Sequence, residues 1–263
     1  MLDIRRRLFR LNRSDVQSKH LHSNILNAQR DGFLETVMRA VVKLGGALFK
    51  RDPDTKAIAS MGQALGAFAR EGNQLVLVAG GGENARTYIA AARKLGAEES
   101  TCDLIGIQVT RVNADLLRLA TGSSAVPKIP TTIAELPTLV GNGKVVVMGG
   151  LQPGQSTNAV AALAAEITRA EALVNGTDVE GVYSEDPKKN PKARLITSVH
   201  VDKLLTWAMS GEVFAGRYEL LDPLALKILQ RAKIPTRFVS LQDPQNIIGA
   251  LRGRHIGTSV VYS

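Results

Sequence analysis

The sequence is poor in the residues on which disulfide-rich proteins and many hydrolases depend. Its 263 residues include one cysteine, Cys102, and four histidines, His20, His22, His200 and His255. A single cysteine cannot form an internal disulfide, and no histidine stands in a nucleophile motif. Two histidines in a polar segment are usually solvated, so we predict no metal site at His20 and His22.

A long apolar run is also missing. No segment approaches the about 20 apolar residues that a membrane span needs, and the basic N-terminus is not followed by an apolar stretch with a cleavage site. We therefore expect a cytoplasmic protein without a membrane partner. The net charge of +9 suits polyanionic ligands, whether nucleotides or nucleic acid.

The chain divides into two parts of different composition. Residues 1–38 lack a sustained apolar period, which predicts a weakly ordered extension. Because Met38 stands just before the first apolar run, translation starting at Met38 is the alternative explanation. Residues 39–263 are predicted to form one domain.

Short apolar runs alternate with helical patterns from Ala40 onward, which predicts a sheet with crossover helices. Strands are expected at 40–44, 75–79, 145–148, 172–175 and 237–240. Helices are expected at 54–70, 83–95, 103–120, 156–169 and 222–233, with Asp54, Asp103, Ser156 and Asp222 as N-caps. Segment 177–197 is expected to be a loop or hairpin. Most strands are apolar on both faces, so the fold class predicted is a three-layer αβα sandwich with a mostly parallel central sheet.

Three of the expected strands end in glycine, at Gly45-Gly46, Gly80-Gly81-Gly82 and Gly149-Gly150. Ligands bind at the carboxyl ends of strands in open α/β sheets, where glycine lets backbone N–H groups approach phosphate oxygens. One glycine pair alone indicates only a tight turn. Three at equivalent positions predict a ligand that carries several phosphates.

Lys43 interrupts the first apolar strand two residues before its glycines. A buried lysine without a partner is costly, so its ammonium group is expected to emerge at the end of the sheet and contact a phosphate. Arg86, about one helical turn after the Gly80 loop, is placed to reach back to another phosphate.

Gly80, Gly82 and Ala85 also fit the dinucleotide-binding pattern G-x-G-x-x-A, with Asp103 as the ribose-binding acid. The match is weak, because Asp103 begins a helical pattern and does not end a strand. Farther along, Asp178, Glu180 and Asp186 lie in the expected loop, where carboxylates can hold Mg²⁺ or orient lysines but are more often only solvated.

Taken together, six motifs resemble the amino-acid kinase family and, within it, the archaeal-type uridylate kinases. They are VKLGG at 42–46, GGGENAR at 80–86, DLIGIQVTRVN at 103–113, GGLQPGQST at 149–157, DVEGVYSEDP at 178–187 and YELLDPLALK at 218–227. The resemblance implies transfer of the γ-phosphate of ATP to UMP, with Mg²⁺ accompanying ATP. It also implies a homohexamer and no nucleic-acid partner.

Site residues follow from the same resemblance. The ATP contacts fall on Gly46, Ala47, Gly82, Arg86, Thr177, Asp178, Tyr183 and Asp186. The UMP contacts fall on Gly81, Asp103, Leu151, Gln152, Pro153, Gly154, Gln155, Ser156 and Thr157. Lys43 and Asp178 are the implied catalytic residues, with Lys43 at the transferring phosphoryl group.

Two residues depart from the subgroup, which usually has asparagine and aspartate where this chain has Asp178 and Glu180. Aspartate at 178 is closer to acetylglutamate kinases and aspartokinases, in which it orients the phosphate-binding lysine. The alternatives are a non-catalytic oxometalate-storage or nucleotide-sensing protein on the same fold, and a kinase with another acceptor.

Overall fold

The computed structural model describes residues 37–141, 143–210 and 222–263. Within it, Met38–Ser263 form one compact unit. The predicted N-terminal extension and the first four residues of the motif at 218–227 lie outside the described residues. The boundary predicted between an extension and a single domain stays a prediction.

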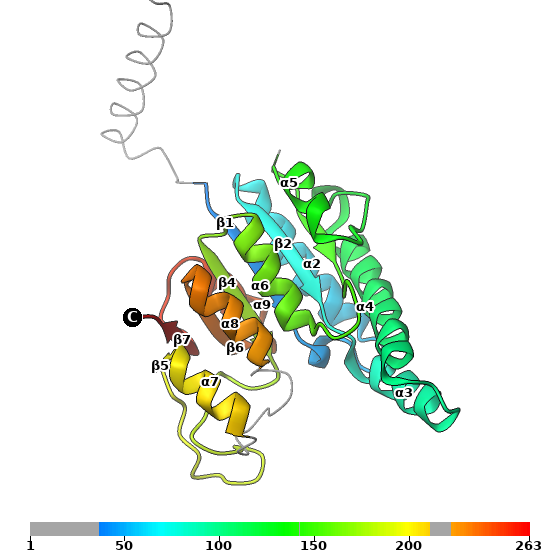
Figure 1. Ribbon diagram of the computed structural model, residues 1–263. Coiled ribbons are helices and arrows are strands. Elements are labelled where there is room, and N and C mark those ends of the chain that lie inside the picture. Colours follow the sequence, from blue (N-terminus) through cyan, green and yellow to red (C-terminus); the bar gives the residue numbers. More distant parts are fainter. Residues whose placement is uncertain (1–36, 142, 211–221) are drawn as a thin grey trace, which may run out of the picture. The chain divides into compact units, whose positions relative to one another are not determined.

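A seven-stranded sheet forms the centre of the described fold (Figure 1). Its strands are β1 (Arg39–Leu44), β2 (Gln74–Ala79), β3 (Val146–Met148), β4 (Ala172–Thr177), β5 (Ser198–His200), β6 (Thr236–Ser240) and β7 (Thr258–Val261). They lie in the order β3-β2-β1-β4-β6-β7-β5, and the first five are parallel. Only β7 pairs with its neighbour β6 in antiparallel fashion, and β5 runs parallel to β7. The predicted mostly parallel sheet is confirmed.

Helices cover both faces of this sheet. They are α2 (Thr55–Arg70), α3 (Gly82–Lys94), α4 (Glu99–Thr121), α5 (Leu136–Leu139), α6 (Thr157–Ile167), α7 (Val201–Ser210), α8 (Pro223–Ala232) and α9 (Pro244–Leu251). Short 3₁₀ turns stand at η1 (Gly46–Leu48), η2 (Gly122–Ser124) and η3 (Ile133–Glu135). Side chains of α2, α4 and α9 pack on one face, and those of α6 and α8 on the other. The three-layer sandwich is therefore confirmed.

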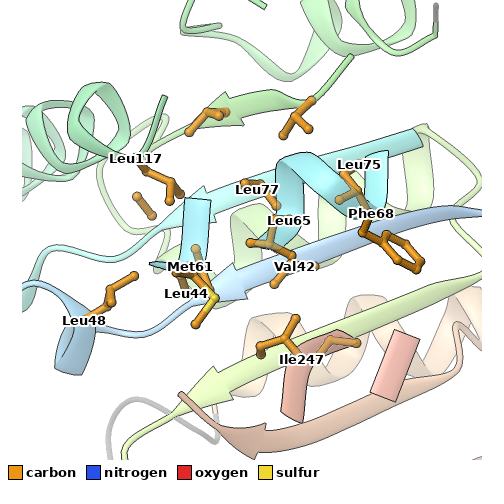
Figure 2. Close-up of a cluster of buried hydrophobic side chains, with 14 of the residues drawn as sticks. Val42, Leu44, Leu48, Met61, Leu65, Phe68, Leu75, Leu77, Leu117 and Ile247 are labelled. Atoms are coloured by element: carbon orange, nitrogen blue, oxygen red, sulfur yellow. The ribbon is translucent and has the colours of Figure 1, made fainter. Parts of the chain in front are cut away.

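Side chains of successive residues in the central strands pack on opposite faces of the sheet. Val42 and Leu44 of β1 join the cluster that includes Met61 and Leu65 of α2, which Figure 2 shows with Ile247 of α9. Val41, between them in sequence, belongs to the cluster on the α6 face. Burial on both faces explains why these strands read as continuous apolar runs.

Three of the four predicted N-caps are confirmed. Asp54 accepts a hydrogen bond from the Ala57 N–H at 3.0 Å, and Asp222 accepts one from the Leu224 N–H at 2.8 Å. The Ser156 hydroxyl accepts from the N–H groups of Asn158 and Ala159, both at 3.1 Å. Each bond satisfies a donor that the first helical turn leaves open.

The prediction for Asp103 was wrong. Helix α4 begins at Glu99, with Glu98 in the N-cap position, so Asp103 lies inside the helix. Cys102 is completely buried in this added first turn, and packing there extends the helix beyond the residue that its capping preference favours. The helix expected to reach Arg169 also ends earlier, at Ile167, because Arg169 adopts a left-handed conformation.

Segment 177–197, expected to be a loop or a hairpin, contains a hairpin. Tyr183 pairs with Leu195 in antiparallel fashion, and the Ile196 N–H donates to the Val182 carbonyl oxygen at 2.8 Å. Of the strands and α-helices that the structure describes, β5, β7, α5, α7 and α9 were not predicted.

Candidate active site

The glycine-ended strands β3, β2 and β1 are neighbours and run parallel, so their carboxyl ends meet at one edge of the sheet. Backbone hydrogen bonds join these ends. The Gly80 N–H donates to the Leu44 carbonyl oxygen at 2.9 Å, and the Gly45 N–H donates to the Gly176 carbonyl oxygen at 3.0 Å. The predicted gathering of three glycine turns is confirmed, and the end of β4 joins them.

Two of these glycines are required by packing as well as by any ligand. Gly82 has φ +66°, and a Cβ there would overlap the carbonyl oxygen of Phe49. A Cβ on Gly149 would lie 2.6 Å from the Thr110 hydroxyl oxygen. Glycine is therefore the residue that lets α3 and α4 approach the strand ends closely.

Lys43 lies on β1 with only 3% of its surface exposed. Its Nζ atom lies 3.6 Å from the position that a Cβ on Gly45 would occupy, so the ammonium group reaches the turn after the strand. Strand alternation places Lys43 on the α6 face, and α6 begins at Thr157, soon after β3. The partial positive charge of a helix N-terminus adds to that of the lysine and favours an anion nearby.

Three polar residues of α4 hold the glycine turns in place. Asn113 Nδ2 donates to the carbonyl oxygens of Gly80 and Gly81, at 2.8 and 3.1 Å. The Thr110 hydroxyl accepts from the Gly150 N–H at 2.7 Å, and Arg111 Nε donates to the Gly150 carbonyl oxygen at 3.2 Å. Sequence reasoning missed these residues, although polar side chains on the buried face of an amphipathic helix were the available signal.

Asp103 and the loop 151–157, both predicted to contact the same nucleotide, are brought together. Asp103 Oδ2 accepts a hydrogen bond from the Gly154 N–H at 2.8 Å. The Ser156 hydroxyl also donates a hydrogen bond to Asp222, which links the N-termini of α6 and α8. Oε1 of Gln155 is buried and has no hydrogen-bond partner among the described residues.

On the other side of Lys43, strand β4 ends at Thr177, and Asp178 follows it. The Thr177 hydroxyl donates to Asp178 Oδ1 at 3.2 Å, and Lys188 forms an ion pair with Asp178 Oδ2. Partial burial raises the pKa of Asp178, but the hydrogen bond and charge of Lys188, with help from Thr177, outweigh it and hold the pKa below its usual value. The lysine paired with Asp178 is thus Lys188, which sequence reasoning missed, and the role expected of Asp178 towards the phosphate-binding lysine stays a prediction.

Tyr183 and Asp186 shape the hairpin on this side. The Tyr183 hydroxyl donates to Glu180 Oε2 at 3.1 Å, and burial, followed by this hydrogen bond and the Glu180 charge, raises the pKa of Tyr183. Asp186 Oδ1 accepts from the Lys188 N–H at 2.9 Å, which fixes a tight turn.

The remaining predicted residues lie around the first two strand ends. Gly46 and Ala47 form the start of η1 directly after β1, with Gly46 buried and Ala47 exposed. Gly81 is the N-cap residue of α3, and Arg86 is exposed in that helix. Because β1 lies between β2 and β4, Lys43 separates the loops near Asp103 from those near Asp178.

The described residues contain no group of three or more histidine, cysteine, aspartate or glutamate side chains that could hold a metal ion. Among the helices that the structure describes, none is long and apolar enough to cross a membrane.

Comparison with known sequences identifies close relatives of the chain. The sequence model of the amino acid kinase family matches residues 38–240. A uridylate kinase of Methanococcoides burtonii is 41% identical over 224 residues, which cover 85% of this chain and 95% of the relative. One from Sulfolobus acidocaldarius is 40% identical over 225 residues, 85% of this chain and 99% of the relative.

Solved structures lead to the same group of proteins. The crystal structure of uridylate kinase from Archaeoglobus fulgidus superposes with a TM-score of 0.75 at 37% identity, covering 85% of this chain and all of that one. Aspartate kinase from Synechocystis superposes with a TM-score of 0.65 at 23% identity, covering 86% of this chain and 40% of that one, which shows a shared fold.

Proposed function

The chain belongs to the amino acid kinase family, and we propose that it acts as a uridylate kinase, which transfers the γ-phosphate of ATP to UMP and so supplies UDP for pyrimidine nucleotide synthesis. The observation that carries the proposal is the position of Lys43. This buried lysine stands at a sheet edge where three glycine turns meet, between two sets of loops. Two phosphate-bearing ligands that approach from opposite sides would meet at its ammonium group.

The acceptor side of the site is formed by Asp103, Gly81 and the loop 151–157. The hydrogen bond from Gly154 to Asp103 closes this loop over α4, which supports a single binding surface for UMP. Leu151, Gln152, Pro153, Gln155, Ser156 and Thr157 complete it.

The donor side is formed by the turns after β1 and β4 and by the start of α3. We assign ATP to Gly46, Ala47, Gly82, Arg86, Thr177, Asp178, Tyr183 and Asp186. Mg²⁺ binding usually combines one or two carboxylates with the phosphates of the nucleotide, so the small number of acids here fits an ion delivered with ATP. The ion would be held mainly by the phosphates of ATP and would neutralise their charge.

Phosphoryl transfer needs little covalent chemistry from the protein. A phosphate oxygen of UMP forms the new bond to the γ-phosphorus, while the bond from that phosphorus to the bridging oxygen of ADP breaks. The UMP phosphate is already ionised, so no general base is required. Lys43 and the N–H groups of the glycine turns position the phosphates and stabilise the charge of the transition state.

The proposal also covers assembly and location: the protein is a cytoplasmic homo-oligomer, for which the resemblance implies six subunits. Leu104, Val112 and Leu119, with exposed fractions of 50%, 61% and 65%, lie on one face of α4. Such an exposed apolar stripe supports contact with a second copy. Light scattering on the purified protein measures the number of subunits.

A panel of acceptors tests the activity. The purified protein is supplied with ATP and Mg²⁺ together with UMP, CMP, N-acetylglutamate or carbamate, and ADP release is followed in a coupled assay. We expect kcat/KM for UMP to exceed that for every other acceptor. Preference for another acceptor would leave a kinase with a different substrate, whereas no turnover together with bound oxometalate, measured by elemental analysis, would favour a storage protein.

A further inference from the structure

Two asparagines form a buried pair beside Lys43. Asn175 on β4 and Asn158 in the first turn of α6 are 5% and 6% exposed, and Asn175 Nδ2 donates to Asn158 Oδ1 at 3.1 Å. The pair fixes the Asn175 amide against α6. Neither residue was among the predicted site residues.

The hydrogen bond to Asn158 uses the Asn175 amide nitrogen and does not involve the carbonyl oxygen of that amide. Oδ1 is buried and accepts no hydrogen bond from any residue that the structure describes. A buried acceptor without a donor is destabilising, and orphans of this kind concentrate where a ligand or a moving group supplies the missing partner.

Lys43 lies directly opposite Asn175 in the sheet. It is the register partner of Asn175 in the parallel β1–β4 pair, and both side chains lie on the α6 face. Just past the end of β1, the next residue on that side is Gly45, and Lys43 Nζ lies 3.6 Å from the position that a Cβ on Gly45 would occupy. An ammonium group has three N–H donors, and a phosphoryl oxygen takes only part of them.

We propose that Asn175 is a positioning residue for Lys43: with both nucleotides bound, its Oδ1 accepts a hydrogen bond from the Lys43 ammonium group and aims that group at the transferring phosphoryl. Asn158 holds the amide so that Oδ1 faces the lysine. This inference rests on the proposed kinase function. It adds a residue that acts on turnover through Lys43 and makes no contact with either nucleotide.

Kinetics of two variants of matched size test the role. Asn175→Leu removes the acceptor, whereas Asn175→Asp keeps an oxygen at the same position. Loss of a hydrogen bond to a charged group predicts that Asn175→Leu lowers kcat about 10- to 100-fold, with both KM values within about twofold of wild type. Asn175→Asp is expected to stay within about threefold in kcat.

Equal losses of kcat in both variants, or a rise in the KM for UMP or ATP as the main effect, would overturn the positioning role. Thermal unfolding of both variants checks that they fold. An Asn175→Leu variant with normal kcat, in a protein whose wild type phosphorylates UMP, would end the inference and leave the proposed function intact.

A crystal structure of the wild-type protein with UMP and a non-hydrolysable ATP analogue decides the same point without turnover. The expected distance from Lys43 Nζ to Asn175 Oδ1 is about 3 Å. A separation beyond about 3.5 Å, or a nucleotide or water donor on Oδ1 in place of the lysine, would contradict the proposal. A crystal with the ATP analogue bound but no UMP at the site would count instead against the proposed function.

Discussion

The two sides of the candidate site are held by different kinds of contact. On the β1–β3 side, backbone atoms bond to one another and to buried side chains such as Asn113. On the β4 side, the hairpin depends on side-chain pairs such as Asp178 with Lys188, whose side chains are 39% and 66% exposed. A Cβ on Gly82 or Gly149 would clash with its neighbours, so the first side tolerates few substitutions there, whereas exposed ion pairs contribute little and can change. The departures from the subgroup, Asp178 and Glu180, both lie on the tolerant side.

The largest effect is expected at the boundary between the two sides. Lys43→Met should lower kcat by about 1,000-fold or more, with both KM values changed only a few-fold, because the ammonium charge acts mainly on the transition state. Steady-state kinetics measure the split. Lys144→Met, at an exposed lysine before β3, is the matched control and should behave as wild type. An unchanged kcat in Lys43→Met would remove this lysine from the mechanism.

The rigid side is probed by adding one methyl group. Gly82→Ala should lower the free energy of unfolding by about 3 kcal/mol or more, because the new Cβ meets the Phe49 backbone at a positive φ. Gly96 also has a positive φ, but nothing lies within 4 Å of a Cβ there, so Gly96→Ala should cost about 1 kcal/mol. Denaturant unfolding measures both. Equal costs would show that the close approach at Gly82 contributes nothing.

Asp103 tests whether the acceptor side binds UMP. Asp103→Ala removes the acceptor for the Gly154 N–H, so the loop 151–157 loses its tie to α4, and the KM for UMP should rise about tenfold with the KM for ATP unchanged. Asp115→Ala, on the same helix and bonded to Arg118, is the control. A selective rise in the KM for ATP would contradict this and would mean that ATP, not UMP, binds on the Asp103 side.

The smallest effect is expected at Asp178. Asp178→Asn restores the residue usual in the subgroup, and the KM for ATP should change by no more than about threefold. The pKa of Asp178 is lower in the folded protein than in the unfolded chain, where it is about 3.9. The ion pair therefore stabilises the folded protein fully above that unfolded pKa. This stabilisation is lost as the pH falls through the lower pKa of the folded state.

Exposure limits the contribution of that ion pair to less than about 1 kcal/mol. The difference in Tm between wild type and Asp178→Asn should therefore be small at pH 7 and disappear at strongly acidic pH. Thermal unfolding across this range measures it. A large loss of turnover in Asp178→Asn would place the catalytic role on the β4 side after all.

Sequence reasoning was most successful where local pattern and burial agree. The strands near Val41 and Val76 are apolar on both faces, and their glycine endings located the edge of the sheet. Sequence reasoning did not predict β5 and β7, which have three and four residues. These strands pair with partners that are far away in the sequence. Such pairing is set by tertiary contacts, which short runs do not reveal.

Within the site, side chains that act through other residues were the ones missed. Asn113 and Thr110 look like ordinary polar positions of a helix until the glycine turns are seen against them. Lys188 pairs with Asp178 across a ten-residue separation that only the hairpin fold explains. The residues assigned to ATP and UMP remain predictions from the resemblance, and the geometry supports them most at Asp103 and Gly154.

The central claim is direct transfer between two nucleotides at Lys43, and ³¹P NMR of the purified protein with ATP, Mg²⁺ and UMP tests it. The account predicts that UDP and ADP appear in equal amounts as ATP and UMP disappear, and that the Lys43→Met protein gives neither on the same timescale. Release of inorganic phosphate without UDP, or unchanged ATP with the wild-type protein, would contradict it.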